Sequence, residues 1–185
     1  MYSLSRDERE FLRRVALESI RHGLEAERPL VPDPGEYISR LQVPGAVFVT
    51  LNLHGKLRGC IGSLEARRPL VEDVARNAYS AAFMDGRFPP LSPEEFPDLE
   101  LHLSLLTPLE PLTVEDREDL LNTLQPGVDG LLLEDPPHRS TFLPQVWESL
   151  ADPEEFLGEL LLKAGLSRDH WSGTLCFHRY RVEEF

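Results

Sequence analysis

The feature that most constrains the fold is a pair of β-forming segments joined by two turn residues. Residues 46–53 read Ala-Val-Phe-Val-Thr-Leu-Asn-Leu, His54 and Gly55 follow, and residues 56–61 return with a second strand pattern. β-branched and aromatic residues favour extended backbone, and a polar residue followed by glycine is typical of a two-residue hairpin turn. We therefore expect an antiparallel hairpin over residues 46–61.

The rest of the chain alternates helical and extended patterns. Leucines at every second position of residues 99–105 alternate with Glu100, His102 and Ser104, as in a half-buried strand. Helical spacing or capping signals predict helices at 5–23, 69–83, 92–95, 113–124 and 152–165, and strands are expected at 128–133 and 175–182. The hairpin and the alternating strand favour antiparallel pairing over a doubly wound parallel sheet. We predict an α+β fold with mainly antiparallel sheets and packed helices.

The length sets the domain organisation. With 185 residues the chain suits one domain, 1–185, or two closely packed subdomains. No linker-like segment marks a boundary between them. We expect the two terminal segments to pack together and the middle of the chain to form a second lobe.

Charge and apolar content exclude several classes of function. The formal net charge of −13 repels nucleic-acid phosphates and anionic lipid surfaces. The charged start lacks a signal-peptide core, and no apolar run approaches the roughly 20 residues of a membrane span. Cys60 and Cys176 are expected to be free thiols, and no pattern for a metal or a nucleotide cofactor is present. We predict a cytoplasmic protein with no cofactor, no bound metal, no nucleic-acid partner and no membrane association.

The main candidate site is the hexapeptide Leu57-Arg-Gly-Cys-Ile-Gly62, at the end of the second hairpin strand. Gly59 and Gly62 would let a ligand approach the backbone, and Cys60 is the candidate nucleophile. Arg58, together with the start of the helix at Pro69, would stabilise a Cys60 thiolate or bind an anion. The alternative is structural: Cys60 is a small buried apolar residue and the glycines serve a β-bulge.

Two further segments carry polar groups. Asp85 and Arg87 flank Gly86, where arginine offers a planar fork for a carboxylate or phosphate and Asp85 would orient it. Alternatively, their contact simply locks this corner of the chain. In the expected loop 136–145, His138 is a weaker candidate as a base for Cys60, provided the fold brings the two together.

These segments together resemble the AMMECR domain family, protein A of the bacterial and archaeal AmmeMemoRadiSam system. The similarity rests on Val47–Leu53, Leu57–Gly62, Pro69-Leu70, Asn77-Ala78 with Ala81-Ala82, Asp85 with Arg87-Phe88, Ser104, Phe142–Val146 and Lys163–Leu166. The resemblance implies a compact architecture of two unequal lobes, with the hexapeptide as the suspected functional site. It also implies an association with a Memo-like, dioxygenase-related protein and a radical-SAM protein as pathway partners. It supplies no established activity.

Two kinds of function fit these residues. In the first, an enzyme or small-molecule-binding protein uses a cleft at Leu57–Gly62, with Cys60 as nucleophile and Arg58 or Arg87 as anion anchor. In the second, a noncatalytic binding module docks a Memo-like or radical-SAM partner. A third interpretation makes the hexapeptide a folding element. The first is slightly favoured, because a cysteine and an arginine framed by glycines are unusual in a purely structural strand.

Overall fold

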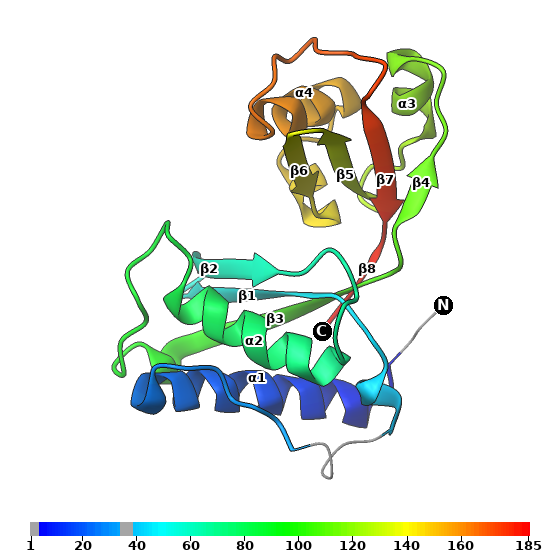
Figure 1. Cartoon of the computed structure of the whole chain (residues 1–185). Helices are drawn as coiled ribbons and strands as arrows, with labels where there is room; N and C mark the ends of the chain where they lie inside the picture. The colour runs from blue at the N-terminus through cyan, green and yellow to red at the C-terminus, as the bar shows by residue number, and fades with distance from the viewer. Residues whose placement is uncertain (1–3, 34–38) are drawn as a thin grey trace. The chain divides into compact units, whose positions relative to one another are not determined.

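The computed structural model describes residues 4–33 and 39–185 and confirms the α+β fold (Figure 1). Its strands pair in two separate four-stranded sheets with antiparallel pairing, and helices accompany each sheet. The chain divides into two compact units. Unit 1 comprises residues 1–106 and 183–185, and unit 2 comprises residues 107–182. Residues near both ends of the chain therefore belong to unit 1.

Unit 1 contains two long helices and a sheet of strand order β2-β1-β3-β8. Its elements are α1 (Arg6–Ala26), η2 (Ser39–Gln42), β1 (Val47–Leu53), β2 (Lys56–Gly62), α2 (Leu70–Phe83), η3 (Phe96–Asp98), β3 (Leu99–Leu106) and β8 (Val182–Glu184). Both α1 and α2 lie on one face of this sheet (Figure 1). Val49, Leu51 and Leu103 point into the core between the helices and the sheet. The side chains between them on β1, including Phe48 and Thr50, lie half-buried on the opposite face.

The predicted hairpin is present as β1 and β2. His54 and Gly55 have φ values of 52° and 72°, so both turn residues adopt the left-handed conformation that a type I′ turn requires. The predicted opening helix is also present, and Ser5 begins it with a capping box. The Ser5 hydroxyl accepts from the Glu8 N–H at 3.2 Å, and the Ser5 N–H donates to the Glu8 carboxylate at 2.7 Å.

Unit 2 contains a second sheet of strand order β4-β7-β5-β6. Its elements are β4 (Glu110–Leu112), α3 (Arg117–Thr123), β5 (Gly130–Asp135), β6 (His138–Phe142), η4 (Pro144–Glu148), α4 (Pro153–Lys163) and β7 (Cys176–Tyr180). Trp147 stacks on Phe156 in its core, with ring centroids 3.7 Å apart, and the Trp147 indole N–H donates to the Asp129 carbonyl. In the described part of the chain, no helix is long and apolar enough to cross a membrane.

Two expectations about unit 2 were wrong. The expected polar loop at 136–145 contains strand β6, because its hydroxyl groups find carbonyl partners: Ser140 donates to Leu160 and Thr141 donates to Leu131. The expected final strand at 175–182 is two strands in two sheets. It is interrupted at Arg181, whose N–H donates to the Thr107 hydroxyl.

The shorter helices differ in detail from expectation. The helix expected to begin at Ser92 is a turn over residues 93–95 followed by the short 3₁₀ helix η3, Phe96–Asp98. Helix α3 begins at Arg117 behind an Asp116 cap rather than at residue 113. Strand β4 was not expected, since prolines precede and interrupt it. It occupies the sheet edge beside β7, where a proline without an N–H is tolerated.

Candidate functional site

The hexapeptide 57–62 belongs to β2, the edge strand of the unit 1 sheet. Thr50 pairs with Cys60 and Leu51 with Gly59, but Asn52 pairs with Leu57, so the register skips Arg58. This irregularity is a β-bulge centred on the arginine rather than on a glycine. The bulge turns the Arg58 side chain out of strict alternation with Cys60.

Both glycines of the hexapeptide face crowded surroundings. A methyl group added at Gly59 would lie 3.0 Å from the carbonyl carbon of Ala81 in α2, and closer still to its oxygen. A methyl group added at Gly62 would overlap the ring of Phe48. Glycine therefore has a packing role at each position, since it lets the last turns of α2 approach β2 and lets Phe48 lie against it. Ligand binding by these glycines stays a prediction.

Arg58 is largely buried and is held by Glu95. Its Nε and Nη2 donate to the two carboxylate oxygens of Glu95 at 2.8 and 3.0 Å, an arrangement that fixes both side chains. Arg58 and then the Ser92 N–H hold the pKa of Glu95 below its ordinary value. The remaining nitrogen, Nη1, is buried with no hydrogen-bond partner in the described part of the chain. Most of the charge of Arg58 is thus committed within the fold.

Asp85 and Arg87 form a pair that closes the outer edge of β2; we call it the Asp85–Arg87 clamp. Arg87 donates to Asp85 from Nε at 2.9 Å and from Nη2 at 2.7 Å. The Cys60 N–H donates to Asp85 at 2.9 Å, and the Cys60 carbonyl accepts from Arg87 at 3.3 Å. Arg87, followed by the Cys60 N–H, holds the pKa of Asp85 well below its usual range, although burial opposes this shift. The N–H and the carbonyl of Cys60 point away from β1, and the Asp85–Arg87 clamp is hydrogen-bonded to both.

The Cys60 thiol lies partly exposed on the face of the sheet opposite the helices. The Thr50 hydroxyl donates to its sulfur at 3.3 Å. Thr50 also pairs with His102 on β3, so Cys60, Thr50 and His102 form a row on one face. Two strand spacings of about 4.8 Å put His102 about 10 Å from Cys60, too far for direct proton transfer.

The expectation that the start of α2 would stabilise a Cys60 thiolate was wrong. Gly59 packs against Ala81, near the carboxyl end of α2, and a helix rise of 1.5 Å per residue puts Pro69 about 18 Å further away. The helix end beside Cys60 is therefore its negative end, which disfavours a thiolate.

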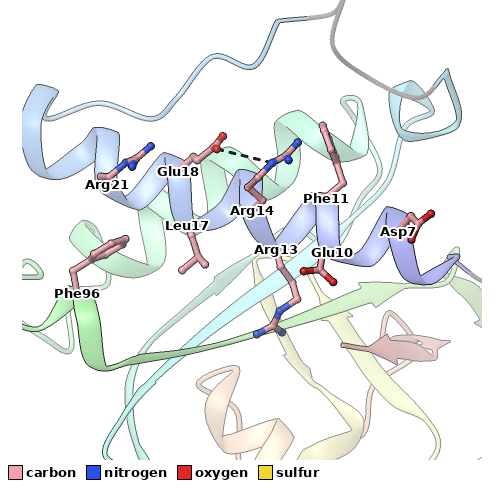
Figure 2. Close-up of a pocket in the computed structure, with 9 residues that line it drawn as sticks. All are labelled: Asp7, Glu10, Phe11, Arg13, Arg14, Leu17, Glu18, Arg21 and Phe96. Atoms are coloured by element: carbon pink, nitrogen blue, oxygen red, sulfur yellow. Dashed lines mark ion pairs between the residues drawn. The ribbon is translucent and has the colours of Figure 1, made fainter.

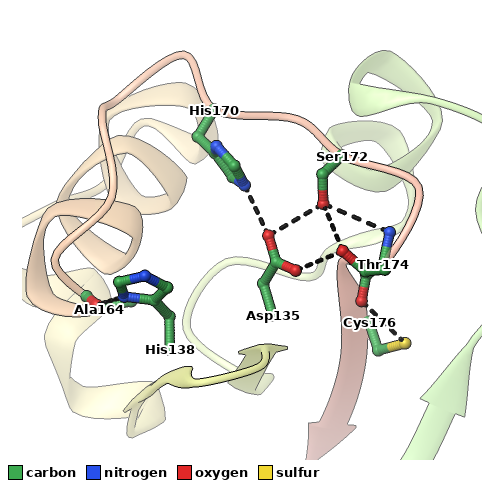
Figure 3. Close-up of polar contacts among 7 residues, drawn as sticks. All are labelled: Asp135, His138, Ala164, His170, Ser172, Thr174 and Cys176. Carbon is green, nitrogen blue, oxygen red and sulfur yellow. Dashed lines mark hydrogen bonds and ion pairs between the residues drawn. The ribbon is translucent and has the colours of Figure 1, made fainter.

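His138 lies at the start of β6 in unit 2, whereas Cys60 lies in unit 1. Its Nδ1 is 2.8 Å from the carbonyl oxygen of Ala164 (Figure 3). The structure thus gives His138 a local contact at the end of α4. Its role as a base for Cys60 stays a prediction.

A polar cluster in unit 2 was not foreseen. Asp135 accepts hydrogen bonds from Thr174 at 2.5 Å, His170 at 2.6 Å and Ser172 at 2.9 Å (Figure 3). These donors, Thr174 first, lower the pKa of Asp135 to about 2. Both hydroxyls donate to the carboxylate rather than to the imidazole, so the arrangement is not that of a nucleophile and its base. In sequence the four residues are isolated polar positions, which gave no signal.

Two hollows lie along α1 in unit 1 and share Arg13 and Leu17. The larger, of about 810 Å³, is lined by nine residues drawn in Figure 2: Asp7, Glu10, Phe11, Arg13, Arg14, Leu17, Glu18, Arg21 and Phe96. The smaller, of about 410 Å³, is lined by Arg13, Leu17, Leu99, Glu100, Leu101 and His102. We call the two together the α1 groove. No group of three or more metal-ligating side chains is placed to hold an ion among residues 4–33 and 39–185.

The chain is an α+β protein with two antiparallel sheets, one in each unit. The hexapeptide lies on the edge strand of the first sheet. A model of the AMMECR1 family matches residues 13–185, and the chain belongs to this family. A Methanothermobacter thermautotrophicus protein is 43% identical over 168 residues, covering 90% of this chain and 86% of its own. A Thermofilum pendens protein is 36% identical over 201 residues, covering 100% and 92%.

A solved structure shows the same fold. The crystal structure of the uncharacterized protein PH0010 from Pyrococcus horikoshii aligns with a TM-score of 0.87 and 35% identity. The alignment covers 95% of this chain and 89% of that one. The recognised resemblance to the AMMECR family is thereby confirmed.

Proposed function

We propose that the protein is a noncatalytic binding module that holds a protein partner in the α1 groove of unit 1. The observation that carries this proposal is the α1 groove itself, a surface hollow with an apolar floor and arginines along it. Leu17 and Phe96 lie in the floor, and Figure 2 shows them pointing toward each other between charged side chains. An apolar centre with a charged rim that includes arginine is typical of protein-binding surfaces.

Two of the arginines at the α1 groove are available to a partner. Arg13 and Arg21 make no hydrogen bond or ion pair within the described residues, whereas Arg14 pairs with Glu18. By contrast, the charged groups around the hexapeptide are already paired: Arg58 with Glu95, and Arg87 with Asp85. The contrast favours binding at the groove over anion capture at the hexapeptide.

The test measures affinity for the two proteins that family association suggests, one Memo-like and one radical-SAM, by calorimetry. Leu17→Glu and Arg21→Glu should each weaken the binding of one of them at least about tenfold, since each places a charge at the groove. Leu162→Glu is the matched control, because Leu162 is 44% exposed on α4 of unit 2. Circular dichroism checks that each variant is folded. Binding that neither groove variant weakens, or no binding to either protein, contradicts the proposal.

A second candidate function is thiol chemistry at Cys60. It is favoured by the Thr50 hydroxyl, which donates to the Cys60 sulfur and would stabilise a thiolate. His102, in the same row, would then act as an acid or base toward a bound small molecule. The test compares alkylation of Cys60 in a Cys176→Ser background with that of Cys176 in a Cys60→Ser background at neutral pH. Labelling of Cys60 about tenfold faster supports this candidate, and labelling only after unfolding excludes it.

A further inference from the structure

Three residues of the α1 groove form a line along the outer side of α1. Arg13, Leu17 and Arg21 are four positions apart, so they follow one another on the same side of the helix, about 6 Å apart along its axis. Leu17 therefore lies midway between two arginines that are about 12 Å apart. Arg13 and Arg21 have no hydrogen bond or ion pair within residues 4–33 and 39–185. The line thus presents a charge, an apolar side chain and a second charge at equal steps.

The apolar step of this line rests on the core of unit 1. Leu17 and Phe96 are both partly buried, and both pack against the core cluster. Figure 2 shows their side chains pointing toward each other, one from α1 and the other from η3. Because the core supports both side chains from beneath, they offer an apolar residue of a partner a contact surface that is already in place before binding.

The lining of the larger hollow favours a helix over an extended strand as the bound element. Eight of its nine residues belong to α1, and Phe96 is the exception. The backbone groups in the interior of a helix are bonded within that helix, so α1 offers none to an incoming strand. A bound helix satisfies its own backbone groups and needs only side-chain contacts, which recur about every four residues along one face. This recurrence matches the spacing of Arg13, Leu17 and Arg21.

The two arginines of the line set the charge of the helix that fits. A carboxylate is the natural partner of a guanidinium group, which presents a planar fork of hydrogen-bond donors. Asp7 and Glu10 line the same hollow on the far side of Arg13 from Leu17, so they would repel a further acidic residue there. The groove therefore fits a helix with one carboxylate opposite Arg13, another opposite Arg21, and no acidic residue one turn further toward Asp7.

We propose that the α1 groove binds an amphipathic helix of a partner protein that carries an acidic, an apolar and a second acidic residue at positions i, i+4 and i+8. The proposal rests on the binding function proposed for the α1 groove and names its occupant. The two carboxylates pair with Arg13 and Arg21, and the apolar residue packs on Leu17 and Phe96. The net charge of −13 repels such a helix at long range. At physiological salt the Debye length is only about 8 Å, so the arginines next to the bound helix outweigh this repulsion.

The probe is a capped, alanine-rich helical peptide of about 17 residues with Glu, Leu and Glu at positions i, i+4 and i+8. Its binding to the full chain is followed by ¹⁵N–¹H NMR at millimolar peptide and physiological salt. We expect shifts of the α1 amides between Arg13 and Arg21. Replacing both Glu residues of the peptide by Gln should weaken binding several-fold, and replacing both by Lys should weaken it at least about tenfold, since the first change removes the two ion pairs and the second makes both contacts repulsive.

Reversing the charge of the groove tests the contacts from the other side. The double variant Arg13→Glu/Arg21→Glu should bind the Lys peptide at least about tenfold more tightly than the unaltered chain does, and it should lose the Glu peptide. The matched control is Arg67→Glu/Arg76→Glu, which changes the net charge equally at two exposed arginines that line neither hollow. The control should leave both affinities nearly unchanged. Circular dichroism checks that both double variants are folded. A folded groove variant that gains nothing for the Lys peptide overturns the proposal.

A proline in the peptide tests whether the occupant is a helix. Proline in place of a solvent-facing alanine between Glu and Leu disrupts a helix but not an extended segment, so it should weaken binding at least about tenfold. A proline peptide that binds as well as its parent overturns the proposal. Unperturbed α1 amides at millimolar peptide also overturn it, and so does equal binding of the Glu, Gln and Lys peptides.

Two further outcomes separate this inference from the broader proposal. If the charge of the peptide has no effect while Leu17→Glu still weakens binding of a pathway protein, the acidic helix is wrong and the binding module stands. If the Glu peptide binds as expected but neither pathway protein binds, the preference of the groove for an acidic helix stands and the proposed partners fall. Sedimentation equilibrium addresses self-association: a dimer that Leu17→Glu dissociates makes a second copy of this chain the occupant and overturns the proposal of a separate partner.

Discussion

Replacing Gly59 by alanine tests whether the hexapeptide glycine serves packing. The added methyl would lie 3.0 Å from the Ala81 carbonyl carbon and closer to its oxygen. Relief to an ordinary contact of 3.4 Å with the Ala81 oxygen requires a backbone shift of well over 1 Å, of either α2 or β2. Movement of β2 also lengthens the 2.9 Å bond from the Cys60 N–H to Asp85.

The expected cost follows from what must move. Overpacking typically costs about 1–3 kcal/mol. Here the added methyl group meets the Ala81 backbone, which cannot rotate away as a side chain can, so we expect a free-energy cost of about 3 kcal/mol. With a urea dependence of about 1–3 kcal/mol per molar, the midpoint for unit 1 should fall by about 1–3 M. The matched control is Gly86→Ala, where an added methyl meets no atom within 4 Å and no positive φ is involved. Its midpoint should stay near that of the wild type.

The assay must report on unit 1 alone. Both tryptophans, Trp147 and Trp171, lie in unit 2, so their fluorescence follows the other unit. Hydrogen exchange of the buried β1 amides, such as that of Val49, in increasing urea reports on unit 1. If Gly59→Ala and Gly86→Ala have β1 midpoints within experimental error of each other, the packing argument for Gly59 is refuted.

Three further predictions concern carboxylates. Glu95→Gln leaves Arg58 buried without a charged partner and should destabilise unit 1 by about 2 kcal/mol, measured by exchange of β1 amides in urea. The pKa of Asp85 is depressed in the folded protein, so its contribution to the stability of the fold is present above its unfolded pKa and is lost only in strong acid. Asp85→Asn should therefore speed the exchange of β2 amides at neutral pH. Unchanged exchange would count against the Asp85–Arg87 clamp. Asp135, with a pKa of about 2 against about 3.9 unfolded, should hold its loop until the pH falls from about 4 toward 2, as reported by Trp171 fluorescence, whereas Asp135→Asn should show no such transition.

Sequence patterns predicted those parts of the fold that depend on contacts between residues close together in the chain. The His54-Gly55 turn and the Ser5 capping box each depend on residues a few positions apart, and each is present. The alternation over residues 99–105 likewise gave a strand, and His102 lies exposed on it as its polar position predicts. Strand β6 was missed because its hydroxyls look loop-like until their carbonyl partners on β5 and α4 are known.

The contacts of the hexapeptide were not predictable from its sequence, and its role as a functional site stays a prediction. Arg58 is hydrogen-bonded to Glu95, which lies 37 positions further along the chain. The Cys60 N–H is hydrogen-bonded to Asp85, 25 positions further along. Neither separation follows from a helical or strand period. The need for glycine at position 59 arises from α2, so the hexapeptide alone could not distinguish close packing from close approach of a ligand. The bulge was among the predicted alternatives, but its location at Arg58 depends on the pairing with β1.

The two candidate sites of unit 1 differ in how far their charged groups are already bonded. At the hexapeptide, the Asp85–Arg87 clamp bonds directly to the N–H and the carbonyl of Cys60. At the α1 groove, Arg13 and Arg21 have no hydrogen bond or ion pair in the described chain. An arginine without a partner can pair with an incoming carboxylate. That difference is why we look for the partner at the α1 groove rather than at the hexapeptide.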